Sequence, residues 1–152
     1  MLIPDYLAHY KFPRSFDNKF VVIGKDTPSY EFNCIAWAFG DCSRWYWPDN
    51  NSNSFWPKTI PRANTLDNFI ELFRLRKFEL CDDGSFENGY IKIAIFCNSN
   101  GVTHAARQLP NGLWSSKLGP FFSVLHTIES ISNGEYGDVT RFMKKECETL
   151  SI

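Results

Sequence analysis

The spacing of hydrophobic residues predicts one amphipathic helix near the middle of the chain. Within residues 65–77, apolar side chains recur at i, i+3, i+4 and i+7, from Leu66 to Phe73. Asn64 or Thr65 stands directly before this series and can cap the first turn. We therefore expect a helix with one apolar face over this segment.

Two shorter segments lie closer to the N-terminus. Residues 19–24 read KFVVIG and predict a short strand. Residues 35–39 follow Cys34 and are apolar on all sides. This pattern predicts a short buried helix that begins beside the cysteine.

After the longer helix, the pattern changes to that of strands. Residues 90–98 read YIKIAIFCN, in which three isoleucines at alternate positions share one face. The turn sequences NSNG and PNG then delimit two further runs, residues 102–109 and 113–118. We expect these three strands to form an antiparallel meander.

The C-terminal segments are less regular. Residues 121–130 predict a helix, and residues 137–147 fit neither period clearly. Helices followed by strands are typical of an α+β protein. Because 152 residues can form one continuous core, we expect a single α+β domain over residues 1–152, with its core at about 19–145.

The longest irregular segment, residues 47–64, reads WPDNNSNSFWPKTIPRAN. It is too aromatic for a linker. We expect a surface loop that Trp47 and Trp56 hold against the core.

The charge composition argues against several classes of partner. The 16 basic and 17 acidic residues give a net charge of −1, which offers no electrostatic support for binding nucleic acid or an anionic membrane. No stretch approaches the roughly 18 apolar residues that span a bilayer, and the N-terminus lacks the pattern of a secretion signal. No sequence feature indicates a cofactor or an oligomeric state.

The five cysteines are odd in number, widely spread and without a CxxC pair. They are Cys34, Cys42, Cys81, Cys97 and Cys147. This arrangement favours neither a metal site nor a disulfide framework, and we expect reduced thiols in a cytoplasmic protein.

Cys34 stands where a helix is expected to start. Residues 30–33 read as extended chain and residues 35–38 as helix. A thiol at a helix N-terminus gains hydrogen bonds from unpaired N–H groups, which stabilise the thiolate and make it a better nucleophile. The simpler interpretation is that Cys34 packs as a small apolar residue.

Of the three histidines, His104 is the best-placed base. It lies near the start of the second meander strand between small residues, which let another element approach closely. Strand alternation places His104, Ala106 and Gln108 on one face. A purely structural histidine remains the alternative, and His126, in the apolar segment VLHTI, predicts a packed side chain.

A catalytic imidazole also needs a polar group that fixes its orientation. If PNG closes a tight hairpin, His104 falls opposite residues 116–118. Ser116 is therefore the best candidate for the orienting group, with Gln108 and Asp41 behind it.

The segment NCIAWAFG resembles the active-site helix of papain-like cysteine peptidases. The segments ENGYIKIAIF and VTHAARQLPNG resemble the strands of the compact NlpC/P60 amidases in that superfamily, in which a cysteine, a histidine and a third polar residue follow one another. The combination of NCIAWA, FWP, THAARQLPNG and WSSKLG is also similar to an uncharacterised bacterial family. The chain departs from the papain pattern because tryptophan follows Cys34 by three positions rather than one.

The resemblance implies a central helix carrying Cys34, packed on the β-meander, in an amide or thioester hydrolase or an acyl transferase. Cys34 would attack a carbonyl carbon, while His104 would act first as base and then as acid. The backbone N–H of Cys34, with Asn33 or Tyr30, would stabilise the oxyanion. Asn33 has a simpler interpretation as a helix cap.

Three functional classes remain open from the sequence. The first is a cysteine hydrolase or transferase acting on a peptide or another amide, with Tyr30, Asn33, Trp47, Trp56 and Gln108 as candidate substrate-binding residues. The second is a non-catalytic inhibitor, immunity or interaction protein on a related scaffold, in which Trp47 and Trp56 anchor a protein partner. The third is a nucleic-acid-associated protein, which the near-neutral charge disfavours.

Overall fold

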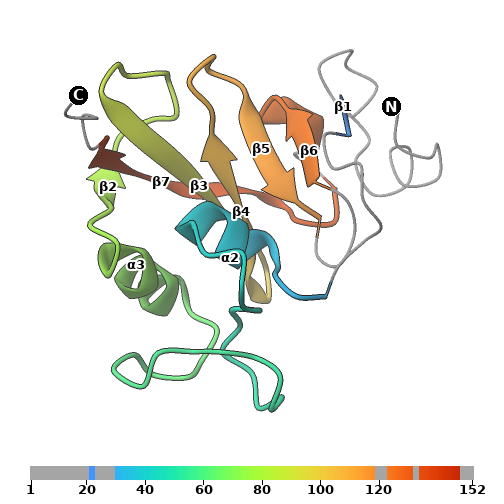
Figure 1. Cartoon of the computed structure of the whole chain (residues 1–152). Helices are drawn as coiled ribbons and strands as arrows, with labels where there is room; N and C mark the ends of the chain where they lie inside the picture. The colour runs from blue at the N-terminus through green and yellow to red at the C-terminus, as the bar shows by residue number, and fades with distance from the viewer. Residues whose placement is uncertain (1–20, 23–29, 119–122, 132–133, 148–152) are drawn as a thin grey trace.

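The computed structural model describes residues 21–22, 30–118, 123–131 and 134–147, and these form one sheet with two short helices (Figure 1). The strands are β1 (Val21–Val22), β2 (Glu79–Cys81), β3 (Tyr90–Asn98), β4 (Gly101–Gln108), β5 (Trp114–Lys117), β6 (Ser123–His126) and β7 (Asp138–Glu146). The helical elements are α2 (Cys34–Phe39), α3 (Leu66–Arg74) and a 3-10 turn, η1 (Glu129–Ile131).

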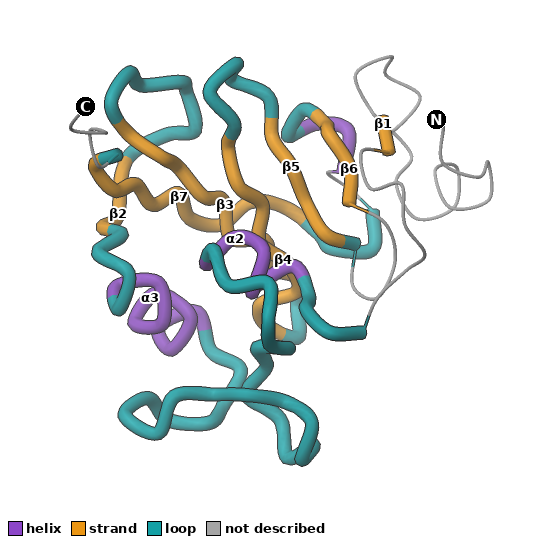
Figure 2. The backbone as a smooth tube through the Cα atoms, viewed as in Figure 1, coloured by secondary structure: helices purple, strands orange, loops and turns teal. Residues whose placement is uncertain are grey.

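The seven strands form a single sheet in the order β1-β6-β5-β4-β3-β7-β2, and every described pairing is antiparallel. The expected meander is confirmed as β3, β4 and β5, and β6 extends it by one strand. The chain then returns so that β7 pairs with the free edge of β3. Figure 2 shows both helices on one side of this sheet.

The expected fold class is wrong. The described chain is mostly antiparallel sheet, with α-helices of only six and nine residues, and is not the helix-centred α+β papain-like fold. The main reason is that residues 123–126 and 138–146, which the hydrophobic pattern left as helix or unassigned, are strands that widen the sheet on both sides of the meander.

The helix predicted over residues 121–130 is wrong where the structure describes it. Ser123–His126 is strand β6, in which Val124 and His126 are buried while Ser123 and Leu125 are half-buried. This alternation spans only four residues, too few to compete with the apolar composition of the segment. Of the strand expected at residues 19–24, the structure describes Val21–Val22 as β1, and the other positions lie outside the described residues.

A capping residue stands at each end of helix α2. Asn33 is its N-cap, with its side chain accepting a hydrogen bond from the N–H of Ala36. Gly40 closes the helix with a φ of 91°, a left-handed conformation that glycine adopts without steric cost. Helix α3 is capped in the same way by Thr65, one of the two expected caps.

Each face of the sheet carries its own apolar cluster. The helix-side core joins α2 and α3 to Ile93, Ile95 and Ala105. The opposite-face core contains Phe96 and Ala106, together with Trp114, Val124 and Ile131. Neighbouring residues of β4 therefore point into different cores, as strand alternation requires.

The long loop of residues 47–64 extends beyond the helices at the lower end of the molecule in Figure 1. Trp47 and Trp56 both pack on Phe69 of α3, with ring centroids 5.4 and 5.1 Å away. The indole N–H of Trp56 donates to the carbonyl of Pro61 at 3.0 Å. The expectation that these tryptophans hold the loop to the core is confirmed.

Candidate functional site

Cys34 is the first residue of α2, and its side chain lies against the sheet with 5% of its surface exposed. The backbone N–H groups of Ala105, Ile35 and Cys34 itself face the sulfur. These donors favour the thiolate, but the loss of water around the buried sulfur outweighs them and raises the thiol pKa to about 11. The resting thiol is therefore protonated.

The N–H of Ala105 faces the sulfur where two strands separate. The β4–β5 ladder has its last pair at Arg107 and Ser115, and the N–H of Leu109 donates to Leu113 within the same hairpin. Because donors alternate along a strand, the N–H of Ala105 also points towards β5. With no β5 partner there, it faces the sulfur of Cys34 instead.

His104 lies beside Ala105 on β4, but its ring is on the other face of the sheet. It pairs with Phe96 across the ladder and meets the Phe96 ring edge-on, with centroids 5.4 Å apart. The ring of Tyr136 stacks on the imidazole at 4.0 Å and 4°. The imidazole is fully buried, and this burial holds its pKa well below the usual value, so it is neutral.

A chain of short hydrogen bonds fixes the imidazole of His104. Its Nε2 lies 2.8 Å from the hydroxyl of Ser116, which lies 2.7 Å from Nε2 of His126. Nδ1 of His126 lies 2.6 Å from the carbonyl of Thr127. The contact expected between His104 and Ser116 is thus present, and it continues into a histidine that the sequence did not assign to the site.

Nδ1 of His104 is buried and has no hydrogen-bond partner among the described residues. No hydrogen bond joins it to the sulfur of Cys34, so the two groups are not an assembled pair in this state. The two groups approach neighbouring residues of β4 from opposite faces of the sheet. The sulfur faces the N–H of Ala105, and the imidazole is the side chain of the preceding residue, His104. The two strands are unpaired at this point.

Lys117 of β5 adds a positive charge near the thiol. Its Nζ donates to the carbonyl of Phe32 at 3.1 Å and lies 4.7 Å from the centre of the Phe32 ring. Burial lowers the pKa of Lys117 to about 8, while the charge of a Cys34 thiolate would raise it. The attraction is mutual, so Lys117 favours ionisation of the thiol.

A family model described as "Domain of unknown function (DUF7689)" matches residues 22–144, which is most of the chain. The chain belongs to the DUF7689 family. No curated protein and no solved structure matches it. Cys34, His104, Ser116 and His126 all lie inside the matched segment of the DUF7689 domain.

Two of the expected substrate-binding residues have structural partners instead. The side chain of Asn33 accepts from the N–H groups of Ala36 and Tyr46 and donates to the carbonyl of Tyr46, and it is only 3% exposed. Gln108 is buried and donates to the carbonyl of Gly84 at 2.8 Å. Both side chains of this DUF7689 domain are buried and bind the backbone, so neither faces an open cleft, and the cap interpretation of Asn33 is confirmed.

Trp56 belongs to the helix-side core and is only 4% exposed, and Trp47 packs against the same core. Tyr30 is different, because 77% of its side chain is exposed and its ring stacks on Trp45 with centroids 6.2 Å apart. Asp41, a reserve candidate for orienting His104, binds Ser43 and Tyr46 instead, and these bonds lower its pKa to about 2.

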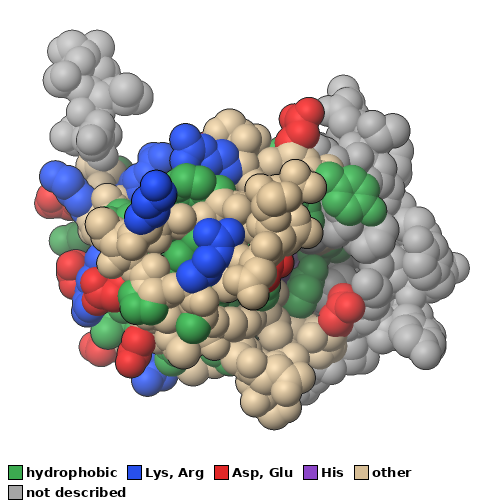
Figure 3. Space-filling model, turned by 90° about the horizontal axis from the view of Figure 1, so that it is seen from below, with side chains coloured by type: hydrophobic (Ala, Val, Ile, Leu, Met, Phe, Trp, Pro, Cys, Tyr) green, Lys and Arg blue, Asp and Glu red, His purple; other side chains and the backbone are tan. Residues whose placement is uncertain are grey.

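Tyr30 and Trp45 form one wall of a surface cleft of about 500 Å³. Its other lining residues are polar: Asp49, Asn51, Asn53 and Ser54. An adjoining hollow of about 380 Å³ continues towards Arg44 and Phe55. Seen from the loop end, the surface is mainly uncharged polar side chains and backbone, with scattered charges (Figure 3).

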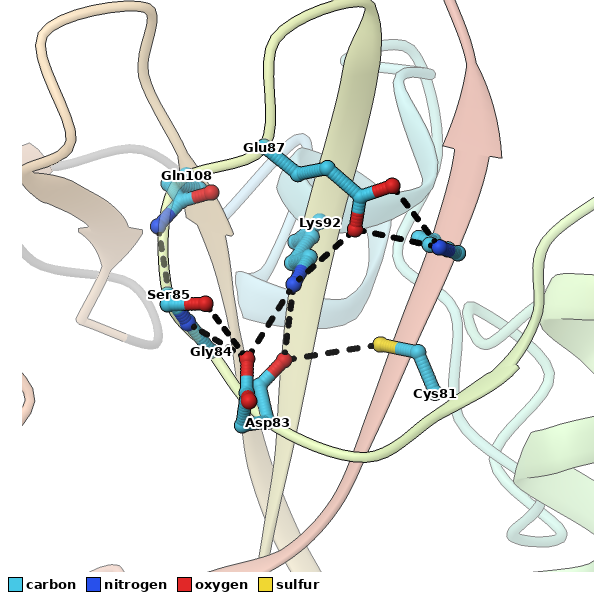
Figure 4. Close-up of polar contacts among 8 residues, drawn as sticks. Cys81, Asp83, Gly84, Ser85, Glu87, Lys92 and Gln108 are labelled. Carbon is cyan, nitrogen blue, oxygen red and sulfur yellow. Dashed lines mark hydrogen bonds and ion pairs between the residues drawn. The ribbon is translucent and has the colours of Figure 1, made fainter.

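The DUF7689 domain has a second polar cluster, in which the buried Lys92 and Gln108 hold the β2–β3 loop (Figure 4). Lys92 of β3 is 2% exposed; its Nζ donates to the carbonyl of Asp83 at 3.0 Å and lies 3.6 Å from the carboxylate of Glu87. Together with the bond from Gln108 to Gly84, it ties this loop to two strands. The described partners account for Lys92, so the cluster is structural.

Three further findings concern the described part of the chain. No group of three or more His, Cys, Asp or Glu side chains within it could hold a metal ion. All five cysteines are free thiols. In the same residues, no helix has both the length and the apolar character needed to cross a bilayer.

Sequence reasoning missed Lys117, His126 and Tyr136. The run WSSKL carries the signal for Lys117, because alternation places Ser115 and Lys117 on the face opposite Ser116. His126 was misplaced by the helix prediction for its segment. No local pattern predicts that Tyr136 stacks on His104, because this contact depends on the return of the chain to the far edge of β3.

Proposed function

We propose that the protein is a cysteine hydrolase or acyl transferase in which Cys34 is the nucleophile and His104 accepts its proton. One observation carries the proposal: the buried Nδ1 of His104 has no described partner, and His104 directly precedes Ala105, whose N–H faces the Cys34 sulfur from the other side of the strand. A buried acceptor without a donor costs about 1–3 kcal/mol, so folded proteins rarely keep one without a role.

The resting state is a neutral thiol on the helix side of the sheet and a neutral imidazole on the opposite face. The proposal requires a movement at the open end of the β4–β5 ladder that brings Nδ1 of His104 within hydrogen-bond reach of Sγ. Proton transfer from Sγ to Nδ1 then accompanies attack of the sulfur on the carbonyl carbon. When the tetrahedral intermediate collapses, the bond from carbon to the leaving nitrogen or sulfur breaks, and the proton on Nδ1 passes to that atom. Water or another acceptor then releases the acyl group from the Cys34 thioester, with His104 again as base.

The backbone N–H groups of Cys34 and Ile35 supply candidate donors for the oxyanion. In the resting state both face the sulfur, from the first turn of α2, where N–H groups lack helical partners. Once the sulfur has bonded to carbon, the same donors can turn to the developing negative charge on oxygen. Asn33 is not available for this purpose because its amide binds Tyr46.

Substrate access requires movement, because Cys34 is almost fully covered and His104 fully covered. Among the described residues, an open cleft lies at Tyr30 and Trp45. Tyr30 precedes Cys34 by four residues, and Trp45 is next to Tyr46, whose backbone is fixed by Asn33. Two stacked rings with amide and hydroxyl groups opposite suit a peptide or another amide-containing chain.

The decisive test is acylation by p-nitrophenyl acetate, with intact-mass measurement and peptide mapping. We expect one acetyl group on Cys34, absent in Cys34→Ala, and formed at least about 100-fold more slowly in His104→Gln, because a general base contributes about 10²–10⁴-fold. The exposed cysteine variant Cys147→Ala is the matched control and should acylate as the wild type does.

Acetyl groups confined to the exposed Cys42 and Cys147, or a Cys34 rate that His104→Gln leaves unchanged, would contradict the proposal. Iodoacetamide cannot replace this test. Because Cys34 is buried and its pKa is about 11, simple alkylation should label the two exposed thiols first, whether or not Cys34 is catalytic.

The same burial favours a second candidate, a non-catalytic interaction protein. Trp47 and Trp56 cannot be its anchors, because both pack on Phe69. Tyr30 and Trp45 would replace them, since Tyr30 is the most exposed of the large apolar side chains described. Failure of acylation at Cys34, with a folded wild-type protein, would favour this candidate.

A further inference from the structure

The hydrogen-bond chain behind His104 has a single consistent arrangement of protons. Nδ1 of His126 faces the carbonyl oxygen of Thr127 at 2.6 Å, and a carbonyl oxygen can only accept. This nitrogen must therefore carry a hydrogen. In a neutral imidazole the other nitrogen is then bare, so Nε2 of His126 is an acceptor.

The remaining positions follow from this end of the chain. Because Nε2 of His126 accepts, the hydroxyl hydrogen of Ser116 points towards it across 2.7 Å. The hydroxyl oxygen of Ser116 then accepts from His104, 2.8 Å away, so Nε2 of His104 carries the hydrogen. Nδ1 of His104 is left as a bare lone pair, and this is the buried atom without a described partner.

The reverse arrangement is unfavourable. If Ser116 donated to His104, it would accept from Nε2–H of His126, and a neutral His126 would then face the Thr127 carbonyl with a bare nitrogen. Two acceptors 2.6 Å apart repel each other. A doubly protonated His126 would avoid this clash, but burial lowers the pKa of His126 to about 4.

We infer that His126 is a positioning residue that acts through Ser116 to hold His104 in the tautomer whose Nδ1 can accept a proton. This inference rests on the proposed function for its catalytic meaning. His126 does not touch the thiol and moves no proton itself. Tyr136, stacked on the ring at 4.0 Å, restricts the rotation that would exchange the two nitrogens.

The tautomers can be read directly by long-range ¹H–¹⁵N NMR of the full-length protein with ¹⁵N-labelled histidine at neutral pH. We expect opposite tautomers, with hydrogen on Nε2 in His104 and on Nδ1 in His126. Ser116→Ala and His126→Phe should each produce a mixture of tautomers at His104. His126→Gln, which offers Ser116 an amide oxygen acceptor, should restore the wild-type form.

Ser115→Ala is the matched control. It makes the same substitution on the same strand, but Ser115 lies on the helix side and binds Trp37 and the Arg107 carbonyl. It should leave the tautomer of His104 unchanged. If the other variants do not fold, the two wild-type tautomers alone still test the inference.

Acylation of Cys34 by p-nitrophenyl acetate separates the inference from the proposed function. We expect Ser116→Ala and His126→Phe to slow it about 10–100-fold, a part of the roughly 10²–10⁴-fold that a general base contributes, because a fraction of His104 keeps the required tautomer. Hydrogen on Nδ1 of wild-type His104 would overturn the inference whatever the acylation rate. Opposite tautomers without any acylation of wild-type Cys34 would instead support the proton arrangement and overturn the proposed function.

Discussion

At the scale of single residues, Asn33 joins a helix to a loop. Its side chain caps α2 at Ala36 and satisfies both the N–H and the carbonyl of Tyr46, at 3.2 and 2.7 Å. Thr65, by comparison, makes only a cap bond to Asn68 at the exposed start of α3. These two residues have the same role at the helix but differ in what else depends on them.

We therefore expect Asn33→Ala to lower the free energy of unfolding by about 2–4 kcal/mol. The lost cap accounts for about 1 kcal/mol, and the unpaired backbone groups of Tyr46 account for the rest. Thr65→Ala should cost about 1 kcal/mol. Urea denaturation of both variants measures the difference, and equal losses would show that the Tyr46 contacts contribute nothing.

At the scale of elements, the position of β7 depends on a close approach between two backbones. Gly137 precedes β7 with a φ of 74°, and a Cβ built there would lie 2.2 Å from the carbonyl oxygen of Cys97 on β3. Gly89 has a similar φ of 88°, but nothing lies within 4 Å of its Cβ position. Substituting each glycine by alanine therefore distinguishes two contributions to stability. Gly89 reports the cost of a positive φ alone, and Gly137 reports that cost together with the clash against Cys97.

Gly89→Ala should lower the free energy of unfolding by about 1–2 kcal/mol, the cost of a left-handed non-glycine residue. Gly137→Ala should cost about 1–3 kcal/mol more, because the Cys97 carbonyl belongs to the backbone and cannot move aside. Urea denaturation again provides the measurement. Similar losses in both variants would mean that β7 shifts along β3 at little cost.

The elements also show what the sequence could and could not predict. β3, β4 and β5 were predictable because alternating apolar residues and the NSNG and PNG turns agree with each other. β2 has three residues, none of them buried, so no apolar face marks it. β6 has a correct alternation that is too short to be recognised beside its apolar neighbours.

The candidate site was predictable to the same extent. Hairpin register was enough to place Ser116 beside His104, because both lie in the meander. Alternation separated His104 from Ala105, but it cannot say which face a helix will cover, since that depends on the packing of distant segments. The sequence did not predict the role of His126 because it predicted a helix in place of β6. The order of hydrogen bonds from His104 through Ser116 to His126 was therefore not predicted either.

At the scale of the whole molecule, two buried neutral histidines make stability depend on pH. Burial lowers the pKa of His126 from 6.5 to about 4 and lowers that of His104 well below 6.5. The unfolded chain therefore binds more protons than the folded protein once the pH falls below about 6.5. Their contribution to stability is complete above this value and is lost as the pH falls towards 4.

We expect the free energy of unfolding to fall between pH 7 and pH 4, by on the order of 3 kcal/mol for His126 alone. Urea denaturation at several pH values measures this slope, and His126→Phe should make it shallower. The carboxylates of Asp41, Asp83 and Glu87 have lowered pKa values, so their contribution is lost only below about pH 4. An unchanged slope in His126→Phe would mean that this histidine is not buried and neutral.

The early end of the β4–β5 ladder has one further consequence. If β4 and β5 paired for one more position, the N–H of Ala105 would donate to the backbone of β5. The sulfur of Cys34 would then lose this N–H and face a continuous sheet. The reactivity proposed for Cys34 therefore depends on the point where β4 and β5 stop pairing. Any substitution that extends the β4–β5 pairing should therefore raise the stability of the sheet and lower the reactivity of the Cys34 thiol.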